Sequence, residues 1–375
     1  MGWSWQVGKI LGIKLRVHAT FALILVWVGM TAWMGGRSLE AALGAVLFVL
    51  LVFGCVVLHE FGHAIAARRF GVGTRDIILL PIGGVARLER IPEDPRQELA
   101  IAAAGPMVNV VIAATLALGM MMGTGSLAVD PEIHMMALPL PSRLLVVNLF
   151  LFAFNLIPAF PMDGGRVLRA LLALRLEYTQ ATEIASTIGQ GMAFLFGFAG
   201  LLTNPFLVFI ALFVWIGARQ EANLVKVRSA LGGIPVQHVM LTEFHTLAPD
   251  DPLARAAELT LSGSQTDFPV LDADEAVGIL TQADLVRGLS EYGESSSVSE
   301  TMHREFHTAS PREMIEPVFL RLQESHCGTI PVLDQSRLVG LVNAENVGEF
   351  LRFQSVLAER GARRSSTGEG GGPGA

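Results

Sequence analysis

The chain has 375 residues, of which 51% are apolar and only 16% are charged, with a formal net charge of −7 at pH 7. This charged fraction is well below the usual quarter of residues, and the negative balance excludes a basic face for nucleic acid. The two cysteines, Cys55 and Cys327, are too few for a disulfide framework, so we expect free thiols. The length suggests two or three domains, and the apolar excess is concentrated in residues 17–218.

Residues 17–218 contain several apolar segments of the length that crosses a bilayer, which is about 20 residues for a helix. We predict about six spans, at residues 17–33, 41–67, 99–122, 144–160, 184–202 and 206–218. Residues 3–16 are too short and too mixed to span, and they lack a signal-peptide cleavage site, so we expect them to lie in the membrane interface. Apolar residues alternate on both sides of Pro81–Gly84, which predicts short membrane-associated strands within residues 68–97.

Positive charges gather on one side of these spans. They precede the first span, lie between the second and third and between the fourth and fifth, and follow the sixth: Lys9, Lys14, Arg16, Arg68, Arg69, Arg75, Arg87, Arg90, Arg96, Arg166, Arg169, Arg175, Arg219, Lys226 and Arg228. The opposite side has only Arg37 and Arg143. Because cytoplasmic loops carry the excess of lysine and arginine, we expect a multi-pass cell-membrane protein with both termini in the cytoplasm. The alanine- and arginine-rich composition favours a bacterial source.

The second predicted span carries the sequence His59-Glu60-Phe61-Gly62-His63 near its end. Residues four apart lie on one face of a helix, so His59 and His63 can bind one metal ion together. Glu60 lies beside them and can take a proton from a water that the metal activates. The alternative is a pair of hydrogen-bonded core histidines. Ionisable residues in a spanning segment are costly and mark functional sites, which favours the metal interpretation.

A third ligand is predicted at the end of the fourth span. Residues 155–165 read NLIPAFPMDGG, in which two prolines break the helix and two glycines permit a tight turn. Asp163 is the only acidic residue between Glu132 and Glu177, and our topology places it at the depth of the two histidines. Catalytic zinc takes three protein ligands and leaves one position open, and two histidines with Asp163 supply that set. The alternative is that Asp163 caps an interfacial helix.

These motifs, together with Ala104-Gly105-Pro106-Met107-Val108-Asn109, resemble the site-2 protease family of intramembrane zinc metalloproteases over residues 7–218. The resemblance implies that His59, His63 and Asp163 bind zinc and that Glu60 is the general base. The usual leucine before the aspartate is Met162 here, a conservative change.

The family pattern implies further roles around this centre. It implies that Asn155 helps to hold the substrate carbonyl or the transition state, and that Gly83 and Gly84 lie where a transmembrane protein substrate pairs as an added strand. In span three, Asn109 is interpreted as a hydrogen-bonding link between helices, and Gly105-Pro106 as a kink or a close helix contact.

The remaining sequence contains an internal repeat at a constant offset of 62 residues. The first-copy segments 243–246, 268–272 and 277–280 correspond to 305–308, 330–334 and 339–342. The repeat resembles a tandem pair of cystathionine-beta-synthase (CBS) domains, an α/β module that often dimerises and often binds adenine nucleotides such as ATP. The resemblance implies that Thr281 and Asp284 contact phosphate and ribose. Asn343 and Asn346 replace them in the second copy, which weakens the case for a second site. A purely structural or dimerising module is the alternative.

The predicted organisation is a transmembrane metalloprotease domain over 1–218, a linker over 219–232, a CBS pair over 233–359 and a disordered tail over 360–375. The repeats of the pair are expected at about 233–294 and 295–356. We expect one zinc ion per chain, a transmembrane protein substrate, and a homo-oligomer formed through the CBS domains. The alternatives in other classes are a CBS-regulated membrane transporter and a catalytically inactive protease homologue that acts as a binding protein.

Overall fold

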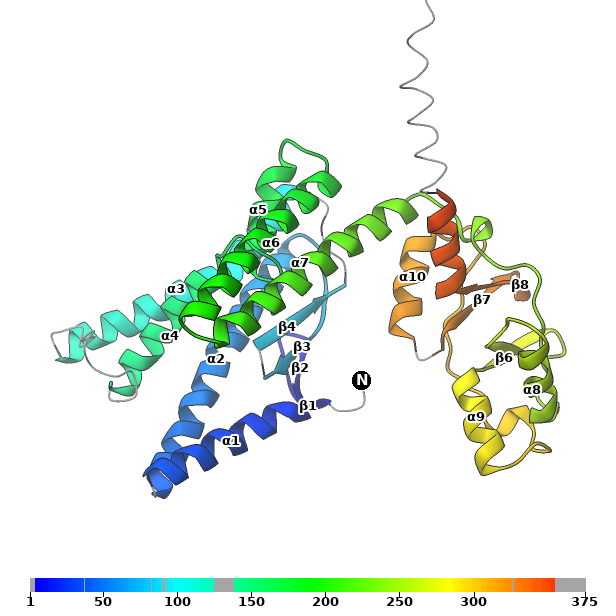
Figure 1. The fold of residues 1–375 in the computed structure, drawn as a ribbon, viewed down its shortest axis with the longest axis horizontal. Coiled ribbons are helices and arrows are strands. Elements are labelled where there is room, and N and C mark those ends of the chain that lie inside the picture. The colour runs from blue at the N-terminus through cyan, green and yellow to red at the C-terminus, as the bar shows by residue number, and fades with distance from the viewer. Residues whose placement is uncertain are drawn as a thin grey trace, which may run out of the picture. The chain divides into compact units, whose positions relative to one another are not determined.

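A computed structural model describes residues 4–36, 38–81, 83–89, 92, 94–124, 138–325 and 327–354 (Figure 1). The tail expected at 360–375 lies outside the described residues. The chain forms two compact units, residues 1–225 and 226–375. Both cysteines are free and buried, in agreement with the sequence.

The first unit is built mainly from helices. They are α1 (Ala19–Gly36), α2 (Leu39–Arg69), α3 (Pro95–Thr124), α4 (Leu140–Asn155), α5 (Asp163–Ala173), α6 (Tyr178–Leu202) and α7 (Phe206–Leu231). Within the described residues, five are long and apolar enough to cross a membrane, namely α1, α2, α3, α6 and α7. Helix α4 coincides with the fourth predicted span; it is apolar, but at 16 residues it is shorter than the other five. The predicted class, a polytopic helical membrane domain, is confirmed.

Helix α2 is the longest of these elements, with 31 residues that rise about 46 Å. The Ser38 hydroxyl caps its first turn by accepting a hydrogen bond from Ala41 N at 3.1 Å. Gly71, with φ of +70°, follows its last turn, a left-handed conformation that glycine adopts without strain. Helices α1, α3 and α4 pack against α2, so α2 is the central helix of the unit (Figure 1).

One four-stranded sheet accompanies the helices, in the order β1 (Ser4–Ile10), β2 (Ile13–His18), β3 (Thr74–Leu80) and β4 (Gly83–Leu88). Strands β2 and β3 are parallel and the other neighbours are antiparallel. The two strands around Pro81 agree with the sequence pattern. The β1–β2 hairpin was not predicted, because residues 3–16 were expected only to lie in the membrane interface. Its turn uses Leu11 and Gly12 at φ of 52° and 90°, the positive values that a tight two-residue hairpin needs.

Asp76 joins three strands of this sheet. Its carboxylate is 3% exposed, pairs with Arg87 of β4, and lies 3.4 Å from the guanidinium of Arg16 in β2. The hydrogen bond from Arg87 holds the pKa of Asp76 below its usual range despite burial. This pairing fixes β4, which is an edge strand of the sheet and packs against α2.

The second unit shows the 62-residue repeat in three dimensions. The first copy contains α8 (Leu253–Ser262), β5 (Phe268–Asp272), β6 (Glu275–Leu280) and α9 (Gln282–Glu291). The second contains α10 (Ile315–Glu324), β7 (Thr329–Asp334), β8 (Arg337–Asn343) and a helix over 344–354. The bridge between Leu247 and Val270 recurs between Ala309 and Val332 at the same offset. Two short 3₁₀ helices, Val236–His238 and Val298–Glu300, also recur at this offset.

The segment between the two predicted domains is helical. Residues 219–232, expected as a linker, continue helix α7 as far as Leu231. Leu231 is fully buried in the core of the second copy, together with Val236 and Ile315.

The two copies of the repeat also contact each other through equivalent positions, because the Thr329 hydroxyl donates to the Asp267 carboxylate at 3.0 Å.

Asp76→Asn tests the sheet. A depressed carboxylate pKa contributes stability that is present above the unfolded-state pKa and is lost as the pH falls through the folded-state pKa. We therefore expect the substitution to cost about 1–3 kcal/mol near neutral pH, and the difference from wild type to vanish in strong acid. The measurement is the thermal unfolding midpoint in detergent from neutral pH into strong acid, below the ordinary pKa of an aspartate. Asp274→Asn, in an exposed turn at φ of 71°, is the control and should leave this pH profile unchanged.

Candidate metal centre

His59 and His63 lie one turn apart on α2, on the face that packs into the helical unit. Both side chains are buried, and their Nε2 atoms are 3.1 Å apart. The rings meet edge to face with centroids 4.8 Å apart. The i, i+4 spacing therefore points both imidazoles at one spot.

Asp163 reaches the same spot from another part of the chain. It is the first residue of α5, and its Oδ2 lies 3.1 Å from His59 Nε2 and 3.2 Å from His63 Nε2. The two glycines after it let the preceding turn fold back on the helix, because a Cβ at Gly164 would lie 2.3 Å from Ile157 O. The carboxylate thus faces the histidine pair. An aspartate that served only to cap a helix would not need to face these histidines.

The histidine hydrogen bonds show what these three groups can hold. His63 Nδ1 donates to Ile101 O at 2.7 Å, and His59 Nδ1 lies 2.8 Å from Asn109 Oδ1. Both oxygens accept, so each neutral ring carries its proton on Nδ1 and a lone pair on Nε2. Two lone pairs and a carboxylate then converge within about 3 Å, which is repulsive unless a cation lies among them. The fixed Nδ1–H groups are the outer hydrogen bonds typical of metal-bound histidines.

The distances fit a small tetrahedral ion. Ligands at about 2.0–2.1 Å from zinc lie about 3.3 Å from one another at tetrahedral angles, close to the separations of 3.1 and 3.2 Å seen here. Two imidazole nitrogens and one carboxylate oxygen are a donor set that zinc accepts with a fourth position open. Among the described residues, this is the only group of three or more histidine, cysteine, aspartate or glutamate side chains that could share a metal ion.

Glycines let α3 approach the centre. A Cβ at Gly105 would lie 2.2 Å from His63 Nε2 and 2.7 Å from His59 Nε2, so any side chain here would displace the imidazoles. A Cβ at Gly62 would lie 2.8 Å from Ala104 O. The structure thus supports a close helix contact at Gly105, and it places Asn109 one turn further along α3, against His59. Asn109 thus forms a hydrogen-bonding link between helices, as the sequence analysis interpreted it, and its partner is His59 of α2.

Glu60 connects the centre to the sheet. Its Oε2 accepts a hydrogen bond from Ala86 N of β4 at 3.0 Å. A Cβ at Gly84 would lie 2.7 Å from Glu60 Cγ, so glycine is required there for the strand to approach α2. Because N–H and C=O directions alternate along a strand, Gly84 and Leu88 present their backbone groups on the same outer edge as Ala86, away from β3.

The contacts described for Asn155 do not join it to His59, His63 or Asp163. It is the last residue of α4, is half-buried, and donates its side-chain amide to Leu151 O of its own helix at 3.0 Å.

The second unit brings Thr281 and Asp284 together at the start of α9. The Thr281 hydroxyl caps Asp284 N at 3.2 Å and donates to the Asp284 carboxylate at 2.5 Å. Arg287 donates to the same carboxylate at 2.6 Å, and His303 Nε2 lies 3.0 Å from it. The side chain is buried and fully engaged, so a ligand has to exchange with these partners. In the second copy, Asn343 Oδ1 caps Asn346 N in the same way.

Arg169 was not predicted as a structural centre. Sequence analysis counted it among the positive loop charges, but it lies on α5 and is 0% exposed. Its partners are 52 and 71 residues away in the chain, so no local pattern points to it.

Comparison with known proteins agrees with this architecture. Peptidase family M50 matches residues 47–138 and 133–198, and the CBS domain matches 236–291 and 298–351. A zinc metalloprotease of Methanocaldococcus jannaschii is 37% identical over 358 residues, 95% of this chain and 98% of its own length. Rip3 of Mycobacterium tuberculosis is 28% identical over 92% of each chain. The solved site-2 protease of Methanocaldococcus jannaschii has 39% identity, covers 59% of this chain and 95% of its own, and gives a TM-score of 0.44.

The relative from Methanocaldococcus jannaschii spans both units of the chain, and the two family matches fall one in each unit. The chain therefore belongs to peptidase family M50, the site-2 protease family of zinc metalloproteases, and carries a tandem pair of CBS domains.

Proposed function

We propose that this membrane protein hydrolyses a peptide bond in or near the transmembrane segment of another membrane protein. The observation that carries the proposal is the convergence of His59, His63 and Asp163, with Glu60 beside them on α2. We assign His59, His63 and Asp163 as the ligands of one zinc ion. The bound zinc supplies a Lewis acid that polarises the substrate carbonyl and lowers the pKa of the attacking water.

Glu60 acts as the general base in this proposal. Its carboxylate accepts the proton of the attacking water and returns it to the amine of the departing peptide. The hydrogen bond from Ala86 N holds one carboxylate oxygen in place and leaves the other for the proton. Asn155 would stabilise the substrate carbonyl or the transition state, for which its amide has to leave Leu151 O.

The outer edge of β4 is proposed as the place where the substrate binds. A substrate helix hides its backbone in internal hydrogen bonds, and a carbonyl becomes reachable only after local unwinding. Pairing with an edge strand replaces the lost bonds. Gly83 and Gly84 begin β4, and Gly84 lies directly over Glu60, so a strand added here would run past the general base.

We further propose that both termini are cytoplasmic in a bacterial cell membrane, with residues 1–218 as the protease domain and 233–359 as a cytoplasmic regulatory domain. The distribution of lysine and arginine supports this topology. A reporter protein that is active only in the cytoplasm should therefore be active when it is fused to either terminus. A reporter that is active only outside the cytoplasm should be inactive at both.

The CBS pair is proposed to bind an adenine nucleotide at Thr281 and Asp284 and to regulate cleavage. The support is the start of α9, where a threonine cap and a buried carboxylate lie together. The asparagines at 343 and 346 lack the negative charge, so we assign a single site per chain.

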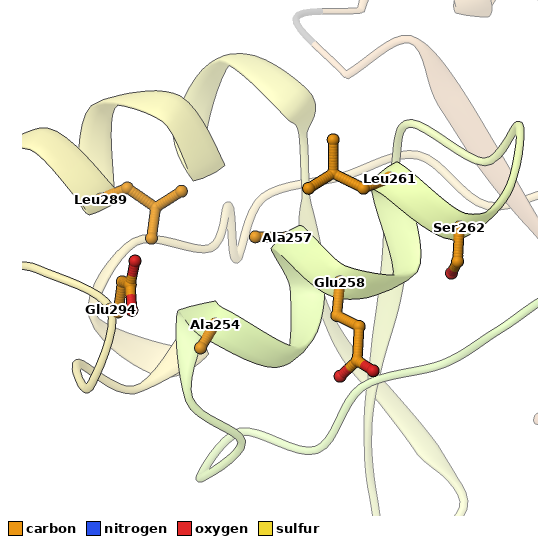
Figure 2. Close-up of a pocket in the computed structure, with 7 residues that line it drawn as sticks. All are labelled: Ala254, Ala257, Glu258, Leu261, Ser262, Leu289 and Glu294. Atoms are coloured by element: carbon orange, nitrogen blue, oxygen red, sulfur yellow. The ribbon is translucent and has the colours of Figure 1, made fainter.

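We also propose that copies associate through the CBS domains. An open pocket between α8 and α9 of the first copy is lined by Ala254, Ala257, Glu258, Leu261, Ser262, Leu289 and Glu294 (Figure 2). Leu261 is 88% exposed at its edge, and Val286 on α9 is 63% exposed. Large apolar side chains that are exposed on neighbouring helices are candidates for an interface.

Glu60→Gln tests the protease assignment. We expect cleavage of a transmembrane substrate in detergent to fall about 10²- to 10⁴-fold, because the base is lost, while one zinc per chain remains bound. Glu40→Gln, the same change at the exposed start of α2, is the control and should retain activity. Undiminished cleavage by Glu60→Gln would refute the role of Glu60. If the protein is a transporter, Glu60→Gln should cause no specific loss of transport. If it is a catalytically inactive homologue, the wild-type protein should show no cleavage.

Asp284→Asn tests the nucleotide site. We expect the affinity for ATP, measured by equilibrium binding to the full chain, to fall about 10-fold or more, since a hydrogen bond to a charged acceptor is lost. Asn346→Ala, at the equivalent position of the second copy, should leave the affinity unchanged. A wild-type chain that binds no adenine nucleotide would refute the site.

Leu261→Glu tests the interface. We expect the mass of the detergent-solubilised protein, measured by light scattering, to fall from an oligomer to a monomer, because a charge enters the apolar surface. Ala344→Glu, an exposed position elsewhere in the unit, is the control. Equal masses for wild type and Leu261→Glu would exclude this surface as the contact.

A further inference from the structure

Arg169 is the largest side chain that is fully buried in the described structure. It lies on α5, six residues after Asp163, and therefore on the same short helix as the proposed third ligand. An arginine at 0% exposure loses all contact with water, so its partners must account for every part of its guanidinium.

Four elements surround this guanidinium. Nε donates to Glu98 Oε1 of α3 at 2.9 Å, and Nη2 pairs with the same oxygen. Nη1 donates to Glu221 Oε1 of α7 at 2.6 Å. The planar group also stacks over the rings of Phe160 and Tyr178, at 5.0 and 4.9 Å from their centroids.

These contacts enclose the segment that carries Asp163. Phe160 lies three residues before Asp163 in the turn, and Arg169 lies six residues after it, so their stacking closes the segment on itself. Helix α7 covers the same turn: a Cβ at Gly217 would lie 2.6 Å from Pro161 Cδ, and Val214 packs with Met162. The turn, α5 and α7 are thus fixed to one another around a single arginine.

We propose that Arg169 is a positioning residue for Asp163, and that its ion pairs with Glu98 and Glu221 set the place of the Asp163 carboxylate relative to the histidines on α2. This inference rests on the proposed zinc site. In this proposal, α3 and α7 restrain the helix that carries the third ligand, and they do so through the Arg169 guanidinium.

The chemistry of arginine is specific to this task. A guanidinium offers five N–H donors in a rigid plane, which lets it bind two carboxylates and stack on two rings at once. Lysine keeps the charge but offers a point-like ammonium without a stacking plane. Arg169→Lys therefore keeps the electrostatic balance of the cluster while it loses the directional restraint on α5.

The experiment measures zinc affinity in the Glu60→Gln background, by competition with a chelator in detergent. We expect Arg169→Lys to lower the affinity about 10- to 100-fold, the usual cost of losing an outer support of a metal ligand. The visible spectrum of the Co²⁺-substituted protein reports ligand geometry directly and should change as well. Arg143→Lys is the matched control, because Arg143 also stacks on a phenylalanine, Phe48, but lies on α4; it should leave both readouts unchanged.

A second variant covers the case in which Arg169→Lys does not fold. Glu221→Gln keeps an acceptor for Arg169 but removes the charge on α7, and we expect a smaller loss of zinc affinity in the same direction. A folded Arg169→Lys or Glu221→Gln protein with wild-type zinc affinity and an unchanged Co²⁺ spectrum would overturn the inference. A reference protein that binds no zinc would instead overturn the proposed function itself.

Discussion

Three electron-rich side chains converge inside an apolar helical unit, and the rest of the structure depends on keeping them there. His59, His63 and Asp163 repel one another unless a cation shares their lone pairs, so the fold must hold them in place. It does so by close backbone approach, which only glycine permits at Gly105 and Gly164. The hydrogen bonds that the two Nδ1 groups donate to Asn109 Oδ1 and Ile101 O then fix the ring orientation. The site therefore depends on helix packing and on the turn that precedes Asp163.

The parts of the site that follow from local spacing could be predicted from the sequence. A helix necessarily brings His59 and His63 to one face, and a single acidic residue at matching depth marked Asp163. The β3–β4 strands were visible as alternation around a turn. The CBS repeat was visible because two copies of one pattern share an offset, and the offset reappears in the structure down to paired bridges and positive-φ turns.

The remaining features depend on contacts between distant segments, which no local pattern encodes. Arg169 has the same sequence signal as a solvated loop arginine, and its burial is decided by carboxylates 52 and 71 residues away. Ile13, Leu15 and Val17 alternate with polar residues, so a strand could have been predicted there, whereas its pairing with β3 comes from contact between distant segments. The amide of Asn155 bonds to its own helix here, so its proposed role requires a change on substrate binding. Residues 219–232 resembled a linker because of their mixed charge, which a helix that continues beyond an apolar span also carries.

The ion pairs of Arg169 also constrain the order in which the first unit is completed. Glu98 precedes Arg169 by 71 residues and Glu221 follows it by 52, so one carboxylate is synthesised before the arginine and the other after it. Until α7 joins the other helices, the guanidinium has only one of its two carboxylate partners. A buried charge is costly when it is incompletely paired. The turn and α5 therefore reach their final packing only when the last helix of this unit is in place.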